Sequence, residues 1–413
     1  MGQIFSDVVE QALEYVFYNE PAQRGKEGFA MLEQASQAGD GDASCALARC
    51  LSGGQYIWAG HGFPCDDDRA EELIRLSVKQ GSAVGVLVSM RMGLMTPSLE
   101  KEMPFASLQE AFDIVLKKAE AGDAFCQYAI GNVYFWWDFV RIFGKGRDSF
   151  STDEAYRLYV KENVEKCEGW FQKAYKGGMW LAGNNLRNYY LEGDKDVGIP
   201  PQPAKAAVIW KQGAEHNYPV HQRFYADQLS EAGDKAEAFE WYKRAAENGE
   251  LAAYYYVGYA YEKGEGVEKN EAEAVRWYEN RLSHGMQVGC ANALGAMYYK
   301  GTGVPQDYAK AFQLISWAYG QGNTWGVYYL GTAYFYGRGT QQDYVKAREI
   351  LEKVDWNNSE VHYCLGVIYG QGLGVTPDIP KAAEHLQKAG NYQPAKEELL
   401  KYKKTLLGKW VRR

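Results

Sequence analysis

The sequence predicts an all-α protein, a solenoid of about ten stacked helix pairs, because three residue types recur in one register. Glycines lie 37, 36 and 35 residues apart at Gly258, Gly295, Gly331 and Gly366. A tyrosine follows each glycine by three residues, at Tyr261, Tyr298, Tyr334 and Tyr369. Alanines keep the same intervals, at Ala274, Ala311, Ala347 and Ala382. Three residue types in step indicate one supersecondary unit that is repeated along the C-terminal half.

The first helix of each unit contains the glycine and the tyrosine. It includes the segments VGYAY at 257–261, LGAMY at 294–298, LGTAY at 330–334 and LGVIY at 365–369. A glycine in the middle of a helix costs about 1 kcal/mol relative to alanine, so we expect a neighbouring backbone to approach closely there. The tyrosine lies on the same face of the helix and is expected to help fill the core.

A glycine-containing loop and an N-cap separate the two helices of a unit. The loops GEGV, GTGV, GRGT and GLGV begin at residues 264, 301, 337 and 372. Glycine adopts the positive φ that ends a helix. The N-cap side chains, which accept hydrogen bonds from the first free N–H groups of the second helix, are Asn270, Asp307, Asp343 and Asp378. The second helix then carries the small alanine and an apolar stripe, so it is expected to pack closely on the first.

The array continues toward the N-terminus with looser spacing. Trp210, Trp241 and Trp277 hold equivalent second-helix positions, 31 and 36 residues apart. Earlier second helices are expected at 22–39, 70–81 and 111–122. We therefore predict irregular repeats over 1–217, regular repeats over 218–390, and a basic capping helix over 391–413.

Two of the irregular repeats carry insertions, near 135–165 and at 194–203. The first insertion contains Trp136, Trp137, Phe139 and Phe143. Insertions in solenoids map to loops on one face, so we predict that residues 135–159 form a surface excursion whose deletion leaves the array folded. If its tryptophans instead fill the core between repeats, deletion lowers the melting temperature.

These motifs resemble the Sel-one-like repeat (SLR) family, a tetratricopeptide relative with units of about 36 residues. The resemblance is strong over 218–390 and weaker but continuous over 22–217. It implies an open right-handed α/α superhelix, and it implies scaffolding or adaptor work without catalysis. The resemblance is specific for the fold and does not identify a partner.

Composition excludes several classes of function. The net charge is -8 and the pI is near 5.5, so a nucleic-acid binder, which needs a basic face, is not expected. Seven cysteines show no framework spacing, which indicates reduced thiols in a cytoplasmic, monomeric protein. No stretch is apolar enough for stable membrane insertion. A membrane-attached scaffold remains an alternative, through acylation of Gly2 and the basic run from Lys401 to Arg413.

The sequence offers little support for chemistry. Its six histidines lack zinc spacing, so no metal or cofactor is expected. Ser98 and Lys101 match the S-x-x-K motif of penicillin-interacting proteins, which keeps a β-lactam-interacting hydrolase as a further alternative. The partner motifs S-D-N and K-T-G are absent. We therefore predict a protein that is not an enzyme and binds a protein or peptide partner.

The candidate binding residues follow from the resemblance, which implies that first helices line the concave face. Exposed concave positions would then lie three residues before, and one, four and five after, the helix glycine. Aromatic side chains at such positions offer large faces with polar tips, which suits a contact surface. Together with Trp325, one turn before the third of these helices, the predicted set is Tyr255, Tyr259, Tyr299, Trp325, Tyr328, Phe335 and Tyr336.

Overall fold

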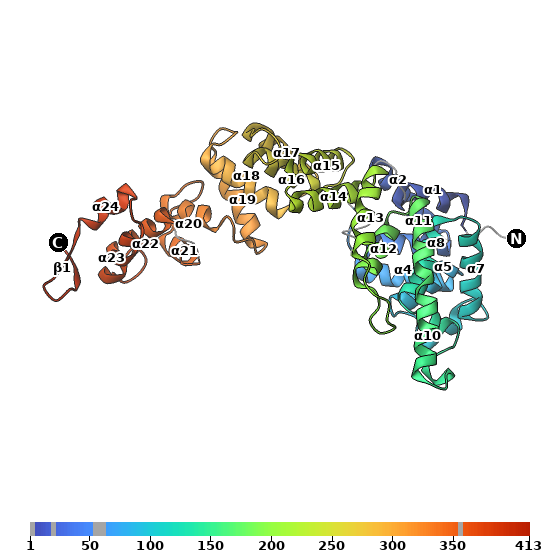
Figure 1. The fold of residues 1–413 in the computed structure, drawn as a ribbon. Helices are drawn as coiled ribbons and strands as arrows, with labels where there is room; N and C mark the ends of the chain where they lie inside the picture. The colour runs from blue at the N-terminus through green and yellow to red at the C-terminus, as the bar shows by residue number, and fades with distance from the viewer. Residues whose placement is uncertain (1–4, 18–21, 53–62, 354–357) are drawn as a thin grey trace. The chain divides into compact units, whose positions relative to one another are not determined.

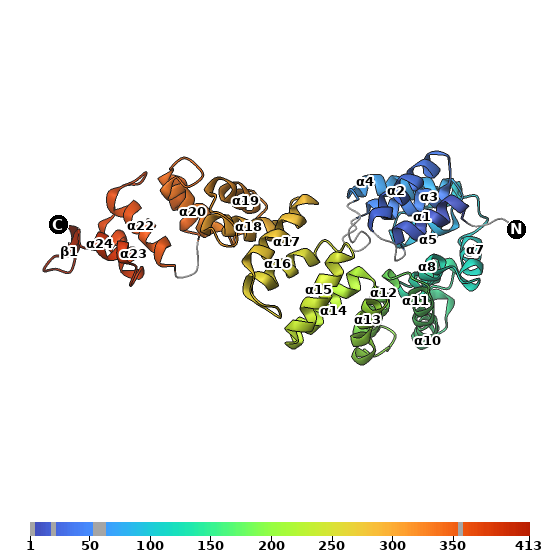
Figure 2. The ribbon, with the colours of Figure 1, turned by 90° about the horizontal axis from the view of Figure 1, so that it is seen from above.

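The computed structural model describes residues 5–17, 22–52, 63–353 and 358–413. The chain divides into two compact units, unit 1 over residues 1–253 and unit 2 over residues 254–413 (Figures 1 and 2). Nearly all regular structure is α-helical, as the repeat pattern predicts. Gly2, the candidate acylation site, lies outside the described residues.

Unit 1 consists of fifteen described α-helices and one short 3₁₀ helix, η1 (Arg147–Ser149). The helices are α1 (Asp7–Phe17), α2 (Ala22–Gln37), α3 (Gly41–Leu51), α4 (Asp67–Lys79), α5 (Ala83–Arg91), α6 (Pro97–Glu102), α7 (Leu108–Glu120), α8 (Ala124–Phe135), α9 (Phe139–Ile142), α10 (Asp153–Val164), α11 (Lys166–Lys176), α12 (Leu181–Glu192), α13 (Pro203–Glu215), α14 (Pro219–Ala232) and α15 (Lys235–Glu247). Six of the predicted helix pairs lie here: α1/α2, α3/α4, α5/α7, α8/α11, α12/α13 and α14/α15.

Unit 2 contains the regular repeats. Its helices are α16 (Ala253–Lys263), α17 (Glu271–Ser283), α18 (Val288–Lys300), α19 (Tyr308–Gly320), α20 (Val327–Tyr336), α21 (Tyr344–Leu351), α22 (Ser359–Gln371), α23 (Ile379–Lys388) and α24 (Gln393–Leu399). Strands β1 (Tyr402–Lys404) and β2 (Trp410–Arg412) follow. The pairs α16/α17, α18/α19, α20/α21 and α22/α23 complete the predicted ten over the described residues.

The mid-helix glycines of unit 2 make room for a side chain, and the expectation of a close backbone was wrong. A Cβ at Gly258 would lie 2.6 Å from the ring of Tyr278, and one at Gly295 would lie 2.6 Å from Ile315 Cγ1. Gly331 and Gly366 face Leu351 and Leu386 in the same way. Each neighbour belongs to the second helix of the same pair and follows its glycine by twenty residues. The glycine therefore fixes the register of the two helices.

The predicted loops and caps are confirmed. Both glycines of each loop have positive φ, for example 70° at Gly301 and 69° at Gly303. The predicted N-cap side chains accept backbone N–H groups of the following helix, as Asp343 does from Lys346 at 2.9 Å. The second loop glycine also touches the preceding repeat: Gly303 lies against the Glu271 carbonyl group, and Gly339 lies against that of Tyr308. No side chain fits between these backbones.

The first part of the insertion, residues 135–143, packs into the core, so the prediction of a surface excursion was wrong for this part, whereas most of 144–159 is exposed. Phe139 is fully buried in α9, and Ile142 is buried beside it. Phe143 stands edge-on to Phe112 of α7, with ring centroids 5.3 Å apart. Trp137 donates its Nε1–H to Asp194 Oδ2 at 3.0 Å, which ties the two predicted insertions together. Of the four aromatic residues only Trp136 is largely exposed.

The C-terminal segment was predicted to be one capping helix, and this prediction was wrong. Helix α24 ends at Leu399, and the chain then forms an antiparallel hairpin in which Tyr402 pairs with Arg412 and Lys404 pairs with Trp410. Tyr402 is buried with Leu386 of α23 and Ala395 of α24. Tyr402 thus anchors the hairpin to the core, while Lys403 and Lys404 of the same strand are exposed.

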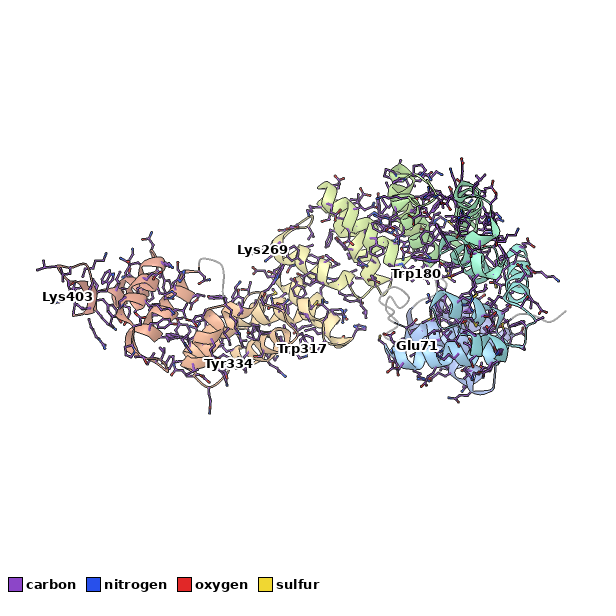
Figure 3. All side chains as sticks on the ribbon, turned by 90° about the horizontal axis from the view of Figure 1, so that it is seen from below. Glu71, Trp180, Lys269, Trp317, Tyr334 and Lys403 are labelled. Atoms are coloured by element: carbon purple, nitrogen blue, oxygen red, sulfur yellow. The ribbon has the colours of Figure 1, made fainter. Side chains whose placement is uncertain are left out.

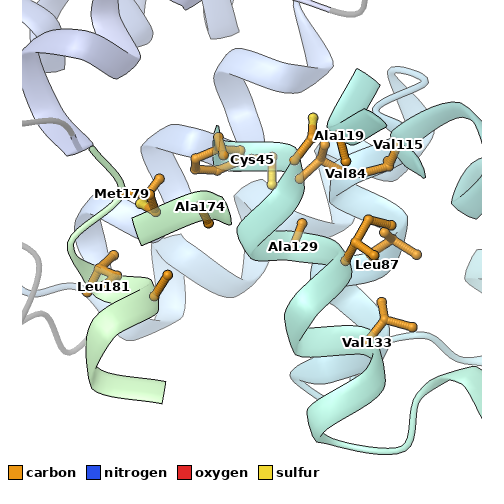
Figure 4. Close-up of a cluster of buried hydrophobic side chains, with 14 of the residues drawn as sticks. Cys45, Val84, Leu87, Val115, Ala119, Ala129, Val133, Ala174, Met179 and Leu181 are labelled. Atoms are coloured by element: carbon orange, nitrogen blue, oxygen red, sulfur yellow. The ribbon is translucent and has the colours of Figure 1, made fainter. Parts of the chain in front are cut away.

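The two units build their cores differently. In unit 1 most of the described buried residues, from Phe5 to Val220, form one continuous cluster. Figure 4 shows part of it, where Leu87 of α5, Ala129 and Val133 of α8, and Leu181 of α12 pack together. In unit 2 the buried residues form separate clusters, each spanning neighbouring repeats. Aromatic side chains fill the spaces between its helices, as Tyr334 of α20 does against Phe312 of α19. Figure 3 labels Tyr334 among the side chains of this unit.

Candidate functional site

Within each unit, first helices of successive pairs contact each other and form a layer. In unit 1, α1 contacts α3, α3 contacts α5, α5 contacts α8, and α8 contacts α12. In unit 2, hydrogen bonds join α18 to α20 and α20 to α22. Alternate helices approach each other on the inner side of a curved stack, so this layer is the concave face on which solenoids bind partners.

Two of the seven predicted aromatic residues are buried, so their prediction as surface contacts was wrong. Tyr299 is 7% exposed and Phe335 is 6% exposed. The Tyr299 hydroxyl lies 3.0 Å from Thr332 Oγ1 on the next first helix and accepts a hydrogen bond of 2.7 Å from Arg338. Both residues lie four positions after the helix glycine. That position faces the next repeat, and its side chain joins one repeat to the following one.

The other five predicted residues are accessible, and we call them the aromatic strip: Tyr255, Tyr259, Trp325, Tyr328 and Tyr336. Trp325 is 73% exposed, and the four tyrosines are half-buried. The Tyr328 hydroxyl donates to the carboxylate of Glu360. The Arg338 guanidinium lies 4.2 Å from the centre of the Tyr336 ring. The strip therefore combines fixed rings with one free indole.

Three tyrosines of the strip, Tyr255, Tyr328 and Tyr336, stay protonated at neutral pH. Burial raises the pKa of Tyr255 to about 12. Burial, together with the Glu360 carboxylate, raises the pKa of Tyr328 well above its usual value. Burial also raises the pKa of Tyr336, with Cys364 and Glu360 adding to the shift. These hydroxyls are hydrogen-bonding groups for recognition and are unsuited to act as bases.

Unit 1 contains a cavity of about 220 Å³ on its first-helix layer, which was not predicted from the sequence. Residues of α3, α5, α8 and α12 line this unit 1 cavity. Its apolar wall comprises Phe17, Val84, Leu87, Val88, Met92, Phe125, Ala129, Val133 and Leu181. Its polar residues are Arg49, Arg91, Tyr128, Asn132, Trp136, Asp138 and Asn185. The volume is below that of a pocket for a drug-sized ligand and suits one or two amino-acid side chains.

Charged groups of the cavity are left without hydrogen-bonding partners. Asp138 Oδ2 is buried and accepts no hydrogen bond. The Arg91 guanidinium stacks on the Trp136 ring at 3.7 Å. Among the described residues neither Arg91 nor Arg49 forms a salt bridge. Buried polar atoms in native proteins are normally satisfied, so Asp138 Oδ2 can accept a hydrogen bond from a ligand. Arg49 is half-buried and Arg91 is exposed, so both guanidinium groups can donate to the same ligand.

The electrostatics of the cavity favour an acidic group. Burial raises the pKa of Asp138 to about 6, although Arg91 opposes the shift. Burial lowers the pKa of Arg91, Asp138 opposes that change, and Arg49 adds to it. The cavity therefore has two guanidinium groups, those of Arg49 and Arg91, and one carboxylate, that of Asp138. The polar rim is completed by Asn132 and Asn185, whose amide groups are hydrogen-bonded at 2.6 Å.

The motifs that suggested chemistry lead to no active site. Ser98 and Lys101 are exposed on α6, a helix of six residues. His221 is fully buried, and its Nδ1 lies 2.8 Å from the Tyr175 hydroxyl. Over the described ranges, no three His, Cys, Asp or Glu side chains gather as metal ligands would. None of the helices in that part of the chain has the length and apolar character needed to cross a bilayer.

A profile of the Sel1 repeat matches seven stretches of the chain, at residues 155–179, 178–218, 225–250, 251–280, 289–323, 326–353 and 359–391. These stretches cover more than half of the chain and include all of the regular repeats. They begin inside the first insertion, so the helix pairs before residue 155 are outside the matched region.

Among curated proteins, a chitin synthase regulator of Malassezia restricta is 38% identical over 80 residues. That stretch is 19% of this chain and 6% of the regulator, so the chain spans a small part of that relative. Two solved structures are also similar. A protective antigen of uropathogenic Escherichia coli with an SLR fold has a TM-score of 0.45 at 21% identity, over 90% of this chain and 89% of the antigen. A Sel1 repeat protein from Oxalobacter formigenes has a TM-score of 0.46 at 23% identity, over 80% of this chain and 90% of that protein.

Proposed function

The chain belongs to the Sel1 repeat family, whose members generally act as scaffolds for protein–protein interactions, and on that premise we propose that it holds a segment of a partner protein on its first-helix layer. The observation that carries the proposal is the unit 1 cavity, where an apolar wall adjoins unpaired charged groups. We assign no reaction to the chain, since Sel1 repeat proteins are typically non-catalytic.

The cavity suits an apolar side chain that is next to an acidic group in a peptide. The aliphatic and aromatic wall would remove the apolar side chain from water. Arg49 and Arg91 would bind the carboxylate, because a guanidinium presents a planar fork that matches its two oxygens. A peptide N–H group would supply the donor that Asp138 Oδ2 lacks. One short peptide would therefore satisfy all three charged groups.

The aromatic strip of unit 2 is the second proposed contact. Large aromatic residues carry much of the binding energy in protein interfaces. Trp325 is 73% exposed, so it loses the most water-accessible surface when a partner covers it. Tyr328 and Tyr336 are held by Glu360 and Arg338, so little side-chain entropy is lost on binding.

Selection of a random peptide library displayed on phage tests the cavity, with the purified full chain as the target. We expect selected peptides to contain an apolar residue beside Asp or Glu. The double variant Arg49→Gln with Arg91→Gln should weaken their binding at least about tenfold, because hydrogen bonds between charged groups contribute about 1.5–3 kcal/mol each. Arg157→Gln is the matched control, since Arg157 is exposed on α10 and does not line the cavity.

Three outcomes would contradict the cavity as the binding site: no selected peptide, a consensus without an acidic residue, or equal binding by the double variant. The strip is tested separately by capture of partners from a lysate of the source cells. There Trp325→Ala and Tyr336→Ala should each weaken binding by about 2 kcal/mol. If capture is unchanged by both substitutions, the strip is not an interface.

A further inference from the structure

The C-terminal hairpin ends in a tight turn. Thr405 N–H donates to the Lys409 carbonyl at 2.8 Å, and Gly408 N–H donates to the Thr405 carbonyl at 2.9 Å. Gly408 has a φ of 77°, the left-handed conformation that closes such a turn without strain. Leu406 and Leu407 are the two central residues. The turn geometry therefore places two neighbouring leucines at the outermost point of the hairpin.

These leucines are an unusual choice for a turn. Gly, Pro, Asn, Asp and Ser dominate turns because they fit the backbone or bond to it, and leucine does neither. Leu406 is 108% exposed and Leu407 is 89% exposed, the highest values among the exposed large apolar side chains of the described residues. Water around such surface is unfavourable, so two adjacent exposed leucines favour transfer into an apolar medium.

Positive charge surrounds the leucines. The segment 401–413 contains Lys401, Lys403, Lys404, Lys409, Arg412 and Arg413, and it contains no Asp or Glu. The whole chain has a net charge of -8, so this basic cluster is distinct from the rest of the surface. Lys401 is paired with Glu398. Lys403, Lys404 and Lys409 are exposed nearest the turn.

The base of the hairpin is fixed to unit 2. Tyr402 is 2% exposed and packs with Leu386 and Ala395, and β2 contacts α23. Trp410 is half-buried at the base of the turn, with Lys404 Nζ 5.3 Å from its ring centre. The exposed leucines are therefore presented by an ordered element, and little conformational entropy is lost when they bind.

We infer that this hairpin binds the surface of an anionic lipid bilayer. Leu406 and Leu407 enter the acyl region, and Lys403, Lys404 and Lys409 contact the lipid phosphates and carboxylates. The layering of the hairpin matches that of a bilayer leaflet, since its apolar tip lies beyond a ring of cations and Trp410 lies at the depth that tryptophan prefers. An acidic protein partner would meet the cations but would need its own apolar pocket for two protruding leucines.

The association is expected to be weak and reversible, because only two side chains enter the acyl region and salt screens the cations. It does not depend on the peptide site proposed above, which lies in unit 1. A partner held there would thus be brought to a membrane surface.

Co-sedimentation of the full chain with lipid vesicles tests the inference. We expect binding to vesicles of phosphatidylcholine mixed with phosphatidylserine at low salt, a decrease as salt is added, and much weaker binding to phosphatidylcholine alone. Leu406→Ser with Leu407→Ser should lower the partition coefficient at least about tenfold, the factor expected for removing a buried leucine from the acyl region. Replacing Lys403, Lys404 and Lys409 by Glu should remove the preference for phosphatidylserine.

Leu158→Ser is the matched control, since Leu158 is 55% exposed on α10 of unit 1 and should not affect vesicle binding. Circular dichroism should be unchanged in all variants, because the substituted side chains are exposed. Failure of the chain to bind the mixed vesicles would overturn the inference. So would equal partitioning of the double-leucine variant and the native chain. If the double-leucine variant instead loses a protein captured from lysate while vesicles are never bound, the turn is a protein contact and the lipid assignment is wrong.

Discussion

Units 1 and 2 consist of the same helix pairs but differ in how completely the pairs fill their first-helix layer. In unit 2 the side chains at one position relative to the helix glycine make similar contacts in successive repeats. Tyr299, for example, contacts the next repeat. In unit 1 the spacing varies, inserted helices pack into one continuous core, and a cavity remains between α3, α5, α8 and α12. Regular repetition therefore gives each repeat similar contacts with its neighbours, whereas the irregular repeats leave a cavity lined by charged groups.

The largest expected effect tests whether the first insertion is core. Phe139→Ala should lower the free energy of unfolding of unit 1 by about 3–5 kcal/mol, because it removes a fully buried ring and leaves a cavity. Leu158→Ala, in the exposed part of the same insertion, should change it by less than about 0.5 kcal/mol. Hydrogen exchange followed by mass spectrometry reports the two units separately. Equal protection of backbone amides from exchange in both variants would mean that Phe139 does not support the core, as the prediction of a surface excursion requires.

The second prediction concerns His221, a fully buried histidine of unit 1. Burial lowers the pKa of His221 from 6.5 to about 3, so the folded chain does not bind this proton at neutral pH. The unfolded chain binds it below about pH 6.5, which stabilises the unfolded state, so the stability of unit 1 falls as the pH drops from 6.5 toward 3. Between pH 7 and pH 5 this group should cost about 2 kcal/mol.

Urea unfolding at the two pH values measures that loss. The variant His221→Gln should lack this part of the pH dependence, whereas His216→Gln, at an exposed position, should keep it. A native-like pH dependence in His221→Gln would show that other groups are responsible.

A smaller effect tests the register of the helix pairs in unit 2. Gly366→Ala should destabilise unit 2 by about 1–2 kcal/mol, because the new Cβ would lie 2.7 Å from Leu386 Cγ and overpacking outweighs the gain in helix propensity. The matched control is Gly169→Ala in α11 of unit 1, where no atom lies within 4 Å of the new Cβ. There the same change should stabilise by about 0.5–1 kcal/mol. Thermal melts of both variants provide the comparison, and a stabilised Gly366→Ala would contradict the packing role.

The smallest effect concerns the aromatic strip. Trp325→Ala should change the free energy of unfolding by less than about 0.5 kcal/mol, because the indole is largely exposed. Tyr299→Phe, which removes a hydroxyl bonded to Arg338, should cost about 1 kcal/mol. The reverse order in denaturant titrations would mean that Trp325 supports the fold.

The sequence was sufficient for the features that repeat. Helix pairs, glycine loops and N-caps depend on local residue types, so a constant spacing identifies them even without a structure. Tyr299 and Phe335 were misplaced because the position after the helix glycine does not show which neighbour the side chain meets. The cavity was missed because Arg49, Arg91 and Asp138 lie in three segments without a common period. The hairpin was missed because a basic run is compatible with helix or strand.

The second glycine of two loops in unit 2 has a consequence beyond local geometry. Gly303 and Gly339 let the loop of one repeat touch the backbone of the repeat before it. The distance between the loop backbone and the preceding repeat at that point sets the angle between successive helix pairs. That angle in turn sets the pitch of the stack. A side chain there would act as a wedge on the outside of the curve, and the small rotation would be amplified along the following repeats. The curvature that a partner meets is thus adjustable through residues that never touch it.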